Sequence, residues 1–184
     1  MAEAATPPVI HPTAVVDPDA RLGSGTVVWS HVCIAAGAVL GSDCKVGHGA
    51  YVDRGVQIGH RCWIHNHACI YRPVSLGDDV FVGPHVVFVN DPDPTFAHTR
   101  DLSGTSWHVS QGATIGANAT IMSDVNLAPY CFIAAGAVVT ADTVPYGLYV
   151  GVPARLKGYR CACGQRYSLT PGLPARCAQC NRAF

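Results

Sequence analysis

The sequence predicts an all-β protein in which short strands wind into a coil of stacked triangular turns, followed by a small metal-binding module. Three observations support this prediction: apolar residues repeat every six positions, an aperiodic segment interrupts the repeat, and four cysteines form two close pairs near the C-terminus. The chain has 184 residues, 49% of them hydrophobic, which is enough for one compact domain with a small appendage.

The repeat places an apolar residue at every sixth position in the first half of the chain. Its members are Ile10, Val16, Leu22, Val28, Ile34, Leu40, Val46, Val52, Ile58, Ile64, Ile70, Leu76, Val82 and Phe88. Small or β-branched residues lie two positions before them, and glycines often follow, where a tight corner needs a left-handed backbone. The unit is too short for a helix and does not fit the two-residue period of an ordinary strand. Three units would close one coil, and stacked coils would pair as parallel strands.

This pattern resembles the hexapeptide-repeat proteins, whose fold is a left-handed parallel β-helix and whose expected assembly is a cyclic homotrimer. The residues themselves support an assembly, because the repeat turns more large apolar side chains outward than a monomer normally exposes. The outward residues are Trp29, Cys33, Tyr51, Trp63, Cys69, Tyr71 and Phe81. By contrast, Cys44, Cys62 and Cys131 occupy small inward positions and are predicted to lie in the core.

An aperiodic segment interrupts the repeat, which stops after Phe88 and resumes at Ile115 with a shifted phase. The intervening residues 89–110 are rich in Asp, Pro, Thr and Ser and lack the period. A structureless connection of this length is uncommon in a compact domain unless it has a function. We therefore expect it to project from the coil and to serve a functional site.

The domain organisation follows from these patterns. Residues 1–8 are expected to form a flexible tail, residues 9–155 the coil, and residues 156–184 the C-terminal module. The first residues lack the basic and apolar regions of a signal peptide, and no apolar run is long enough to cross a membrane. With nine cysteines and no export signal, a reducing cytoplasm is expected. Twelve basic residues balance twelve acidic ones, so we expect neither nucleic acid nor a membrane as partner.

The C-terminal module contains two close cysteine pairs separated by a Pro- and Gly-rich stretch. The four residues are Cys161, Cys163, Cys177 and Cys180. Four thiolates suit a tetrahedral zinc ion, and a complete set of four leaves no open position for catalysis. We therefore predict a structural zinc site that resembles a zinc ribbon, because so short a segment cannot fold on burial alone.

The coil carries sequence segments that resemble a known enzyme family. The run GAVVT, VP and VGVPAR looks like the acyl-coenzyme A end of hexapeptide-repeat acyltransferases. Upstream, HPTAVVDPDARLGSGTVVWSHVCI, VSLGDDVFVGPHVVFVND and GATIGANATI look like the sugar-nucleotide 3-amino N-acetyltransferases over residues 9–160. Members acetylate UDP-linked 2-acetamido-3-amino glucuronate or dTDP-linked 3-amino-6-deoxyhexoses. The resemblance thus implies an acetyl-CoA-dependent N-acetyltransferase with coenzyme contacts at Ala117, Ala135, Gly136, Thr140, Val152, Pro153 and Arg155.

The chain departs from this family around the inserted segment. Thr95 and the pair Ser110-Gln111 stand where basic residues are frequent in the family. A sugar acid would therefore lack these partners, which favours a substrate without a uronate carboxylate.

Residues three repeats apart lie above one another in adjacent coils, so the repeat predicts which polar side chains share a column. The columns are His67 with His85, His48 with Asn66, and Arg54 with Arg72 and Asn90. Acetylation of an amine requires a route for its proton and donors for the developing oxyanion. An imidazole titrates in the useful range, so His85 is the first candidate base, with Asn90 orienting the amine. The remaining substrate contacts are expected from His67, Asn66, Arg72 and Arg54, the arginines near nucleotide phosphate.

Three alternatives remain open on the sequence. An amine of low pKa would need no protein base, because the departing thiolate can take the proton. A γ-type carbonic anhydrase binds zinc through one His and, two coils later, His-x4-His; His60-x4-His65 is present, but Ser24 stands two coils earlier. The pair His31 and His67 also lacks its third ligand, since Arg72 occupies that position. The last alternative is a non-catalytic trimeric scaffold whose zinc ribbon binds a partner.

Overall fold

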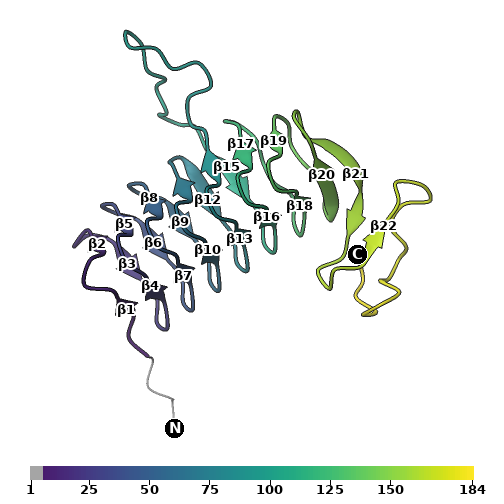
Figure 1. The fold of residues 1–184 in the computed structure, drawn as a ribbon, viewed down its shortest axis with the longest axis horizontal. Coiled ribbons are helices and arrows are strands. Elements are labelled where there is room, and N and C mark those ends of the chain that lie inside the picture. Colours follow the sequence, from purple (N-terminus) through teal and green to yellow (C-terminus); the bar gives the residue numbers. More distant parts are fainter. Residues whose placement is uncertain (1–5) are drawn as a thin grey trace.

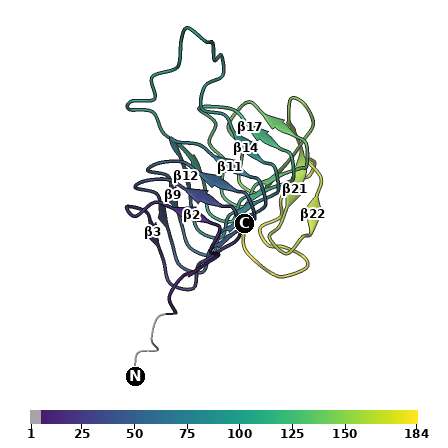
Figure 2. The same cartoon turned by 60° about the vertical axis from the view of Figure 1, so that its left-hand side comes forward.

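The computed structural model describes residues 6–184 and consists of short strands joined by tight turns (Figure 1). That range contains 22 strands and no helix. The strands form three sheets, here called faces A, B and C, which wrap the three sides of a prism whose coils stack along its axis (Figure 2). The predicted all-β coil of six-residue units is confirmed. In the described residues no helix has the length and apolarity needed to span a membrane.

Face A has ten strands and runs the whole length of the molecule. Its first eight strands are parallel, and the last two turn back antiparallel. In spatial order they are β1 (Val9–Ile10), β4 (Val27–Val28), β7 (Lys45–Val46), β10 (Trp63–Ile64), β13 (Phe81–Val82), β16 (Thr114–Ile115), β18 (Phe132–Ile133), β20 (Gly147–Val150), β21 (Arg155–Arg160) and β22 (Arg166–Tyr167).

Faces B and C complete the prism with parallel strands. Face B contains β2 (Val15–Val16), β5 (Cys33–Ile34), β8 (Tyr51–Val52), β11 (Cys69–Ile70), β14 (Val87–Phe88), β17 (Thr120–Ile121) and β19 (Val138–Val139). Face C contains β3 (Arg21–Leu22), β6 (Val39–Leu40), β9 (Gln57–Ile58), β12 (Val74–Leu76) and β15 (Trp107–Val109).

The apolar repeat forms the core. Ile34, Val46 and Ile64 are each at most 1% exposed, and full burial of such a side chain contributes about 1.5–3 kcal/mol. The small inward positions are equally closed, as predicted for the three core thiols; Cys44, Cys62 and Cys131 are all 0% exposed. Residues three repeats apart pair between neighbouring coils, as Val28 does with Val46. Position in the repeat therefore determines which face or corner a side chain occupies.

The turns between faces form three corners. Corner AB, from face A to face B, comprises residues 11–14, 29–32, 47–50, 65–68, 83–86, 116–119 and 134–137. Corner BC comprises residues 17–20, 35–38, 53–56, 71–73, 89–106 and 122–125, and corner CA residues 23–26, 41–44, 59–62, 77–80, 110–113 and 128–131. Each corner is a continuous ridge along the prism.

The inserted segment is shorter than predicted. The sequence suggested a loop over residues 89–110, but Trp107–Val109 is strand β15 and pairs with β12, with Val74 opposite Trp107. The repeat thus resumes at Val109, which is 1% exposed, and the loop covers residues 89–106 at corner BC. A single inward valine beside a bulky Trp is too short a pattern to recognise in the sequence.

The insertion does not correspond to a whole number of repeats. In the regular coils Val28 pairs with Val46, three repeats further along the chain, whereas across the loop Val82 pairs with Ile115. The coil that carries the loop is therefore longer than its neighbours by two and a half repeats. This half repeat accounts for the shifted phase of the apolar series after the loop.

The two ends of the chain differ from simple coils. Residues 1–5 of the predicted flexible tail lie outside the described residues, whereas Thr6 accepts a hydrogen bond from the Gly25 amide at 2.8 Å. At the other end β21 spans Arg155–Arg160 and pairs with β20. The predicted boundary between residues 155 and 156 therefore falls inside a strand of face A, and the C-terminal module continues that sheet directly.

A glycine at corner AB leaves room for the ring of His67. Gly49 has φ +64°, and a Cβ there would lie 2.5 Å from Nδ1 of His67. Gly55 at corner BC has φ +69°, and a Cβ added there would have no neighbouring atom within 4 Å. Gly49→Ala should lower the free energy of unfolding by more than Gly55→Ala, which pays only the left-handed backbone cost of about 1–2 kcal/mol. Denaturant titration of both variants checks this; equal losses would contradict the contact with His67.

Candidate active site

Corner AB carries a row of histidines. His31, His67 and His85 occupy the same turn position in their coils, each with φ 57°, and Asn118 and Gly136 take that position in later coils. His67 and His85 stack with ring centroids 5.1 Å apart and planes 20° apart, as the column prediction requires. Both side chains are exposed at the ridge.

His48 completes the row, although sequence analysis placed it in the neighbouring column. Its ring lies 5.3 Å from His31 and 5.1 Å from His67, edge-on to both. It occupies the level of Gly49, which has no side chain, and its Nδ1 is 2.9 Å from Oγ of Ser30. In the sequence, the sign of this arrangement is that Gly49 interrupts the column of histidines directly after His48. We call His31, His48, His67 and His85 the histidine ladder.

The residues that resemblance assigns to coenzyme A continue the same ridge. Ala117, Ala135 and Gly136 belong to the corner AB turns of the two coils after His85. The Gly136 amide donates to the Ala117 carbonyl at 2.8 Å, so these turns stack directly. Val152 and Pro153 follow Gly151, whose carbonyl accepts a hydrogen bond from Val138. One ridge therefore brings the histidine ladder and most of the expected coenzyme contacts into line.

The other predicted substrate residues lie on corner BC. Asn90 follows β14 whereas His85 precedes it, so the two stand at opposite edges of face B. Arg54 and Arg72 belong to this second corner, and Thr140, which follows β19, lies at the same edge. Within one chain the structure therefore does not bring Asn90 beside His85. Arg155 opens β21, with its Nη1 donating to the Ala154 carbonyl at 3.1 Å.

A nearly buried carboxylate organises corner BC. Asp53 is 9% exposed and accepts hydrogen bonds from the Tyr51 hydroxyl at 3.0 Å and the amides of Arg54 and Arg72 at 2.8 and 3.3 Å. The Arg72 Nε lies 3.9 Å from the same carboxylate. Asp53 thus fixes the backbone of both arginines, while their side chains reach the surface.

The loop of residues 89–106 projects from corner BC well beyond the prism (Figures 1 and 2). Arg100 anchors it through a two-pronged ion pair with Asp124, both N···O distances being 2.8 Å. The Arg100 hydrogen bonds hold the pKa of Asp124 below its usual value. At the tip Phe96 is fully exposed. The loop is therefore tied at its base and free to contact another molecule at its end.

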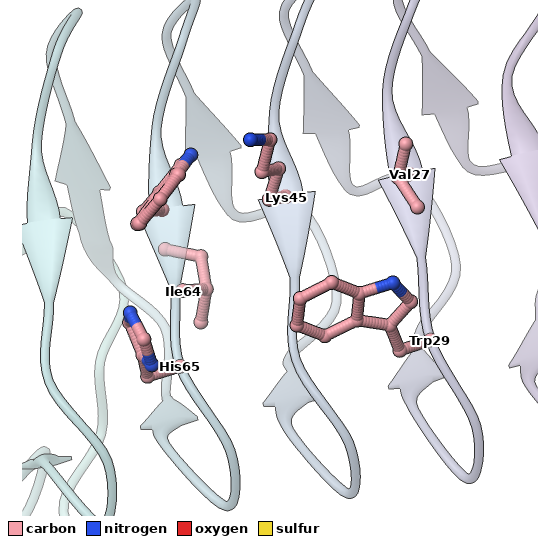
Figure 3. A pocket seen from close by; sticks show the side chains of 6 residues that line it. Val27, Trp29, Lys45, Ile64 and His65 are labelled. Carbon is pink, nitrogen blue, oxygen red and sulfur yellow. The ribbon is translucent and has the colours of Figure 1, made fainter.

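An apolar hollow lies on the outer surface of face A (Figure 3). Trp29 and Trp63 remain 48% and 42% exposed there, which confirms the predicted outward orientation of these aromatics. Between them the Nζ of Lys45 lies 4.4 Å from the Trp63 ring centre. His65 lines the same hollow. Exposed indoles next to one another indicate a surface that another molecule covers.

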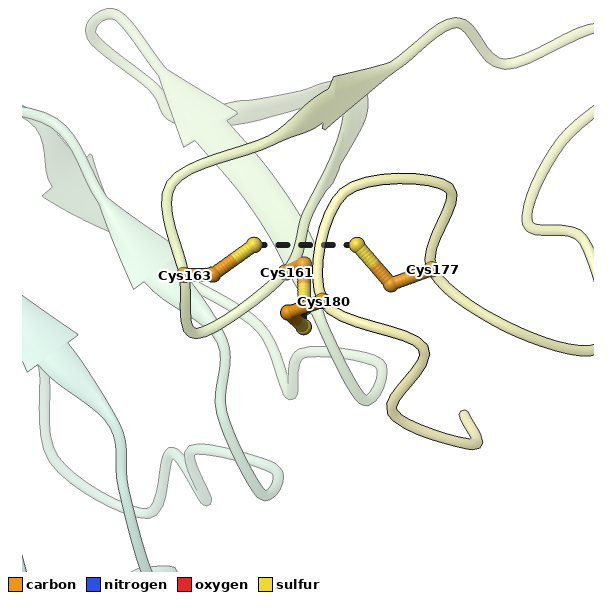
Figure 4. Close-up of side chains that lie close together, drawn as sticks. All are labelled: Cys161, Cys163, Cys177 and Cys180. Atoms are coloured by element: carbon orange, nitrogen blue, oxygen red, sulfur yellow. Dashed lines mark hydrogen bonds between the residues drawn. The ribbon is translucent and has the colours of Figure 1, made fainter.

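The four C-terminal cysteines converge on one point (Figure 4). All four sulfur atoms lie within 4.8 Å of one another, and the Cys161–Cys180 and Cys163–Cys177 separations are 3.7 and 3.6 Å. A tetrahedron of thiolates at the usual Zn–S distance of about 2.3 Å has S–S edges of about 3.8 Å. The donor set therefore fits zinc. It is also the one such group of metal-ligating residues within residues 6–184, and no histidine triad occurs there.

Aromatic rings join the cysteine cluster to the coil. The Tyr167 hydroxyl donates to Sγ of Cys177 at 3.2 Å, and its ring packs edge-on against Phe184. Phe184 in turn packs against Tyr146, which stacks on Tyr130 with centroids 5.1 Å apart. The module is thus continuous with the last coils, as the pairing of β21 also shows.

Family models match the repeat region. The model described as bacterial transferase hexapeptide (six repeats) matches residues 55–90. The model described as hexapeptide repeat of succinyl-transferase matches residues 18–54, 37–72 and 111–141. The gap between the matches, residues 91–110, contains most of the projecting loop.

Proteins similar over most of this chain narrow the family. The dTDP-3-amino-3,6-dideoxy-alpha-D-galactopyranose 3-N-acetyltransferase of Aneurinibacillus thermoaerophilus is 34% identical over 175 residues, 95% of this chain and 89% of the relative. Among solved structures, a histidine-to-alanine variant of the GDP-perosamine N-acetyltransferase from Caulobacter crescentus, in complex with CoA and GDP-perosamine, is similar with TM-score 0.53 and 27% identity. That match covers 84% of this chain, which spans only 58% of the solved chain.

A second similar structure also contains a bound coenzyme. It is a hexapeptide-repeat-containing acetyltransferase from Vibrio cholerae complexed with acetyl coenzyme A, with TM-score 0.58, 25% identity, and coverage of 67% of this chain and 70% of that one. The repeat architecture, the matched family models and the relative similar over nearly the whole length agree. The chain belongs to the hexapeptide-repeat N-acetyltransferases that act on nucleotide-linked amino sugars.

Proposed function

We propose that the chain transfers the acetyl group of acetyl-CoA to the 3-amino group of a UDP- or dTDP-linked amino sugar. The observation that carries the proposal is the alignment along corner AB, where the histidine ladder leads into the turns of Ala117, Ala135 and Gly136. Such a ridge offers backbone amides and carbonyls for a long, thin pantetheine chain and an imidazole at its reactive end. The Aneurinibacillus thermoaerophilus relative, a 3-N-acetyltransferase of a dTDP-linked sugar, supports this substrate class.

In the proposed reaction the amine nitrogen attacks the thioester carbonyl carbon. A C–N bond forms, the C–S bond breaks, and coenzyme A leaves as a thiolate that takes up a proton to become the thiol. His85 accepts the proton that the amine loses, since an imidazole has a suitable affinity near neutral pH. His67, stacked on His85, and Asn66 beside it contact the sugar nucleotide.

We further propose a homotrimer whose active sites lie between subunits. Asn90, Arg54 and Arg72 stand a full face away from His85 in the same chain. A neighbouring subunit that packs against face A or B can present its corner BC, including the projecting loop, to the His85 ridge. Asn90 would then orient the amine, and the two arginines would approach the phosphates of the nucleotide. The exposed Trp63 on face A and Trp29 at the adjoining edge of corner AB provide apolar surface for such a contact.

The four C-terminal cysteines hold a structural zinc ion in this proposal. Zinc bound by four thiolates has no open position, so its contribution is to the fold of the module rather than to the reaction. Reduced thiols and acetyl-CoA are both consistent with a cytoplasmic setting, which we include in the proposal.

Replacing His85 tests the proposed base. His85→Ala should lower kcat by about 10²- to 10⁴-fold, the usual range for one general base, with little change in the KM for acetyl-CoA. His31→Ala, at the far end of the same ladder, serves as the matched control and should stay within a few-fold of wild type. Steady-state kinetics over about pH 5–8, the range in which an imidazole titrates, provide the readout. A His85→Ala enzyme with a near wild-type rate and a flat pH profile would contradict His85 as the base. The departing sulfur would then be the group that takes the proton.

Mixed trimers test the shared active site. Asn90→Ala should raise the KM for the aminosugar and lower kcat, because a positioning residue acts on both states. When His85→Ala and Asn90→Ala chains are refolded together, some interfaces unite an intact His85 with an intact Asn90. Activity should then recover well above either variant alone. No recovery in a verified mixture, or a stable monomer in sedimentation, would contradict an intersubunit site.

Metal analysis tests the zinc site. The purified chain should contain about one zinc per subunit, and Cys163→Ser combined with Cys180→Ser should release it. Cys33→Ser, which changes a thiol on face B, is the control and should retain the metal. Zinc retained in the double variant would place the ligands elsewhere.

A further inference from the structure

The projecting loop divides into an exposed tip and a closed base. Residues 92–99 are all exposed, whereas Asp91 and Arg100, which flank them, are partly buried. The Arg100 amide donates to one oxygen of the Asp91 carboxylate at 2.9 Å, and the Asp93 amide donates to the other at 3.1 Å. These donors, that of Arg100 first, hold the pKa of Asp91 below its usual value. The carboxylate is therefore ionised at neutral pH and closes the chain on itself at this point.

The side chain of Arg100 ties this base to the coil that follows the loop. Its Nη1 and Nη2 atoms each donate to a different oxygen of Asp124, both at 2.8 Å. Asp124 lies in the corner BC turn between β17 and β19, with φ 63°. The Arg100 guanidinium also lies 5.8 Å from the ring centre of Trp107, which is only 2% exposed. We call Asp91, Arg100 and Asp124 the loop clasp.

The loop has few other attachments. Beyond Arg100, Leu102 packs against the core and the Thr105 amide donates to the Leu102 carbonyl at 3.2 Å. The part from Asp91 to Arg100 has no such apolar anchor and depends on the clasp. A two-pronged arginine–carboxylate pair fixes orientation as well as distance. An exposed ion pair contributes little to global stability, so loss of the clasp should loosen the loop without unfolding the coil.

Asn90 lies between the coil and the clasp. The Val89 amide donates to the Ile121 carbonyl at 2.8 Å, at the end of the pairing between β14 and β17. Asp91, the first residue of the clasp, follows Asn90 directly. The backbone of Asn90 is therefore held on both sides, and a shift of Asp91 would displace it. The proposed coenzyme ridge lies at the opposite edge of face B, away from the clasp.

We infer that Arg100 and Asp124 are positioning residues for the acceptor, because the loop clasp holds the loop and Asn90 in the orientation that the aminosugar nucleotide requires. The inference rests on the proposed function, in which Asn90 orients the amine and the loop reaches the neighbouring active site. Neither residue needs to touch the substrate. The clasp thus acts on recognition of the aminosugar nucleotide and leaves recognition of acetyl-CoA unchanged.

Removing the charge of Asp124 tests the inference. Asp124→Asn keeps the side-chain shape and should raise the KM for the aminosugar nucleotide by about fivefold, the upper range for an exposed ion pair, without changing the KM for acetyl-CoA. Arg100→Met should have the same effect. The exchanged pair, Arg100→Asp with Asp124→Arg, should return this KM toward the wild-type value relative to either exchange alone. Partial unfolding, by contrast, would lower the apparent kcat and leave both KM values unchanged.

A second two-pronged pair provides the matched control. Arg61 donates to the two oxygens of Asp79 at 2.6 and 2.9 Å on corner CA, and both side chains are partly exposed. Asp79 borders a polar hollow between the coil and the C-terminal module, which Arg160 and Arg182 also line. Asp79→Asn removes the same charge from a comparable pair away from the loop. It should leave both KM values at the wild-type level.

Hydrogen exchange of the full-length chain without substrate gives a readout that does not depend on activity. Peptides containing the Asp93 and Arg100 amides should exchange faster in Asp124→Asn than in wild type or Asp79→Asn, while core peptides remain unchanged. Unchanged exchange in the loop, an unchanged KM for the aminosugar nucleotide, or an equal rise in both KM values would overturn the inference. Faster exchange in a chain that acetylates no aminosugar would retain the clasp and contradict the proposed function. Acetylation that is insensitive to the clasp variants would retain the function alone.

Discussion

The register between stacked coils is the constraint on which the rest of the structure depends: in the regular coils, on either side of the one that carries the loop, each residue lies over the one three repeats earlier. It is maintained by inward residues with almost no exposed surface, such as Val46, Ile64 and Ile115. Because close-packed cores tolerate little change in volume, a slip of one residue would place polar side chains inside. The register therefore converts spacing in the sequence into columns in space. His67 over Gly49, and His85 over His67, follow from it directly.

The same register explains why chemistry gathers at the corners. Strands of two residues leave little room for a site on a face, whereas each turn exposes two or three side chains at a fixed height. At corner AB these are histidines in the middle coils and small residues, Ala117, Ala135 and Gly136, in the later ones. In the proposed function the histidine rings face the reactive thioester, and the backbone of the later turns contacts the pantetheine chain. At corner BC the same geometry, organised by Asp53, presents arginines and the long loop.

Sequence analysis predicted the coil, the core thiols and the His67–His85 stack because each depends only on local spacing. Its prediction for the end of the loop was wrong. Strand β15 already belongs to the repeat through Val109, but the insertion before it is not a whole number of repeats. Counting in sixes from Phe88 therefore misses Val109. The place of His48 in the ladder depends on how its ring is oriented across Gly49. The hollow at Arg160 and Arg182 depends on how the module packs against the coil. Neither follows from periodicity, because ring orientation and packing between dissimilar segments are not encoded in the spacing of one repeat.

The account is tested most directly by a crystal structure of the chain with acetyl-CoA and an unreactive analogue of the aminosugar nucleotide. It predicts that pantetheine lies along Ala117 and Ala135 on corner AB. It also predicts that the amine position, about 3–3.5 Å from the thioester carbon, lies within hydrogen-bonding distance of the His85 imidazole. Acetyl-CoA bound along corner BC or CA, with its thioester remote from the histidine ladder, would contradict it.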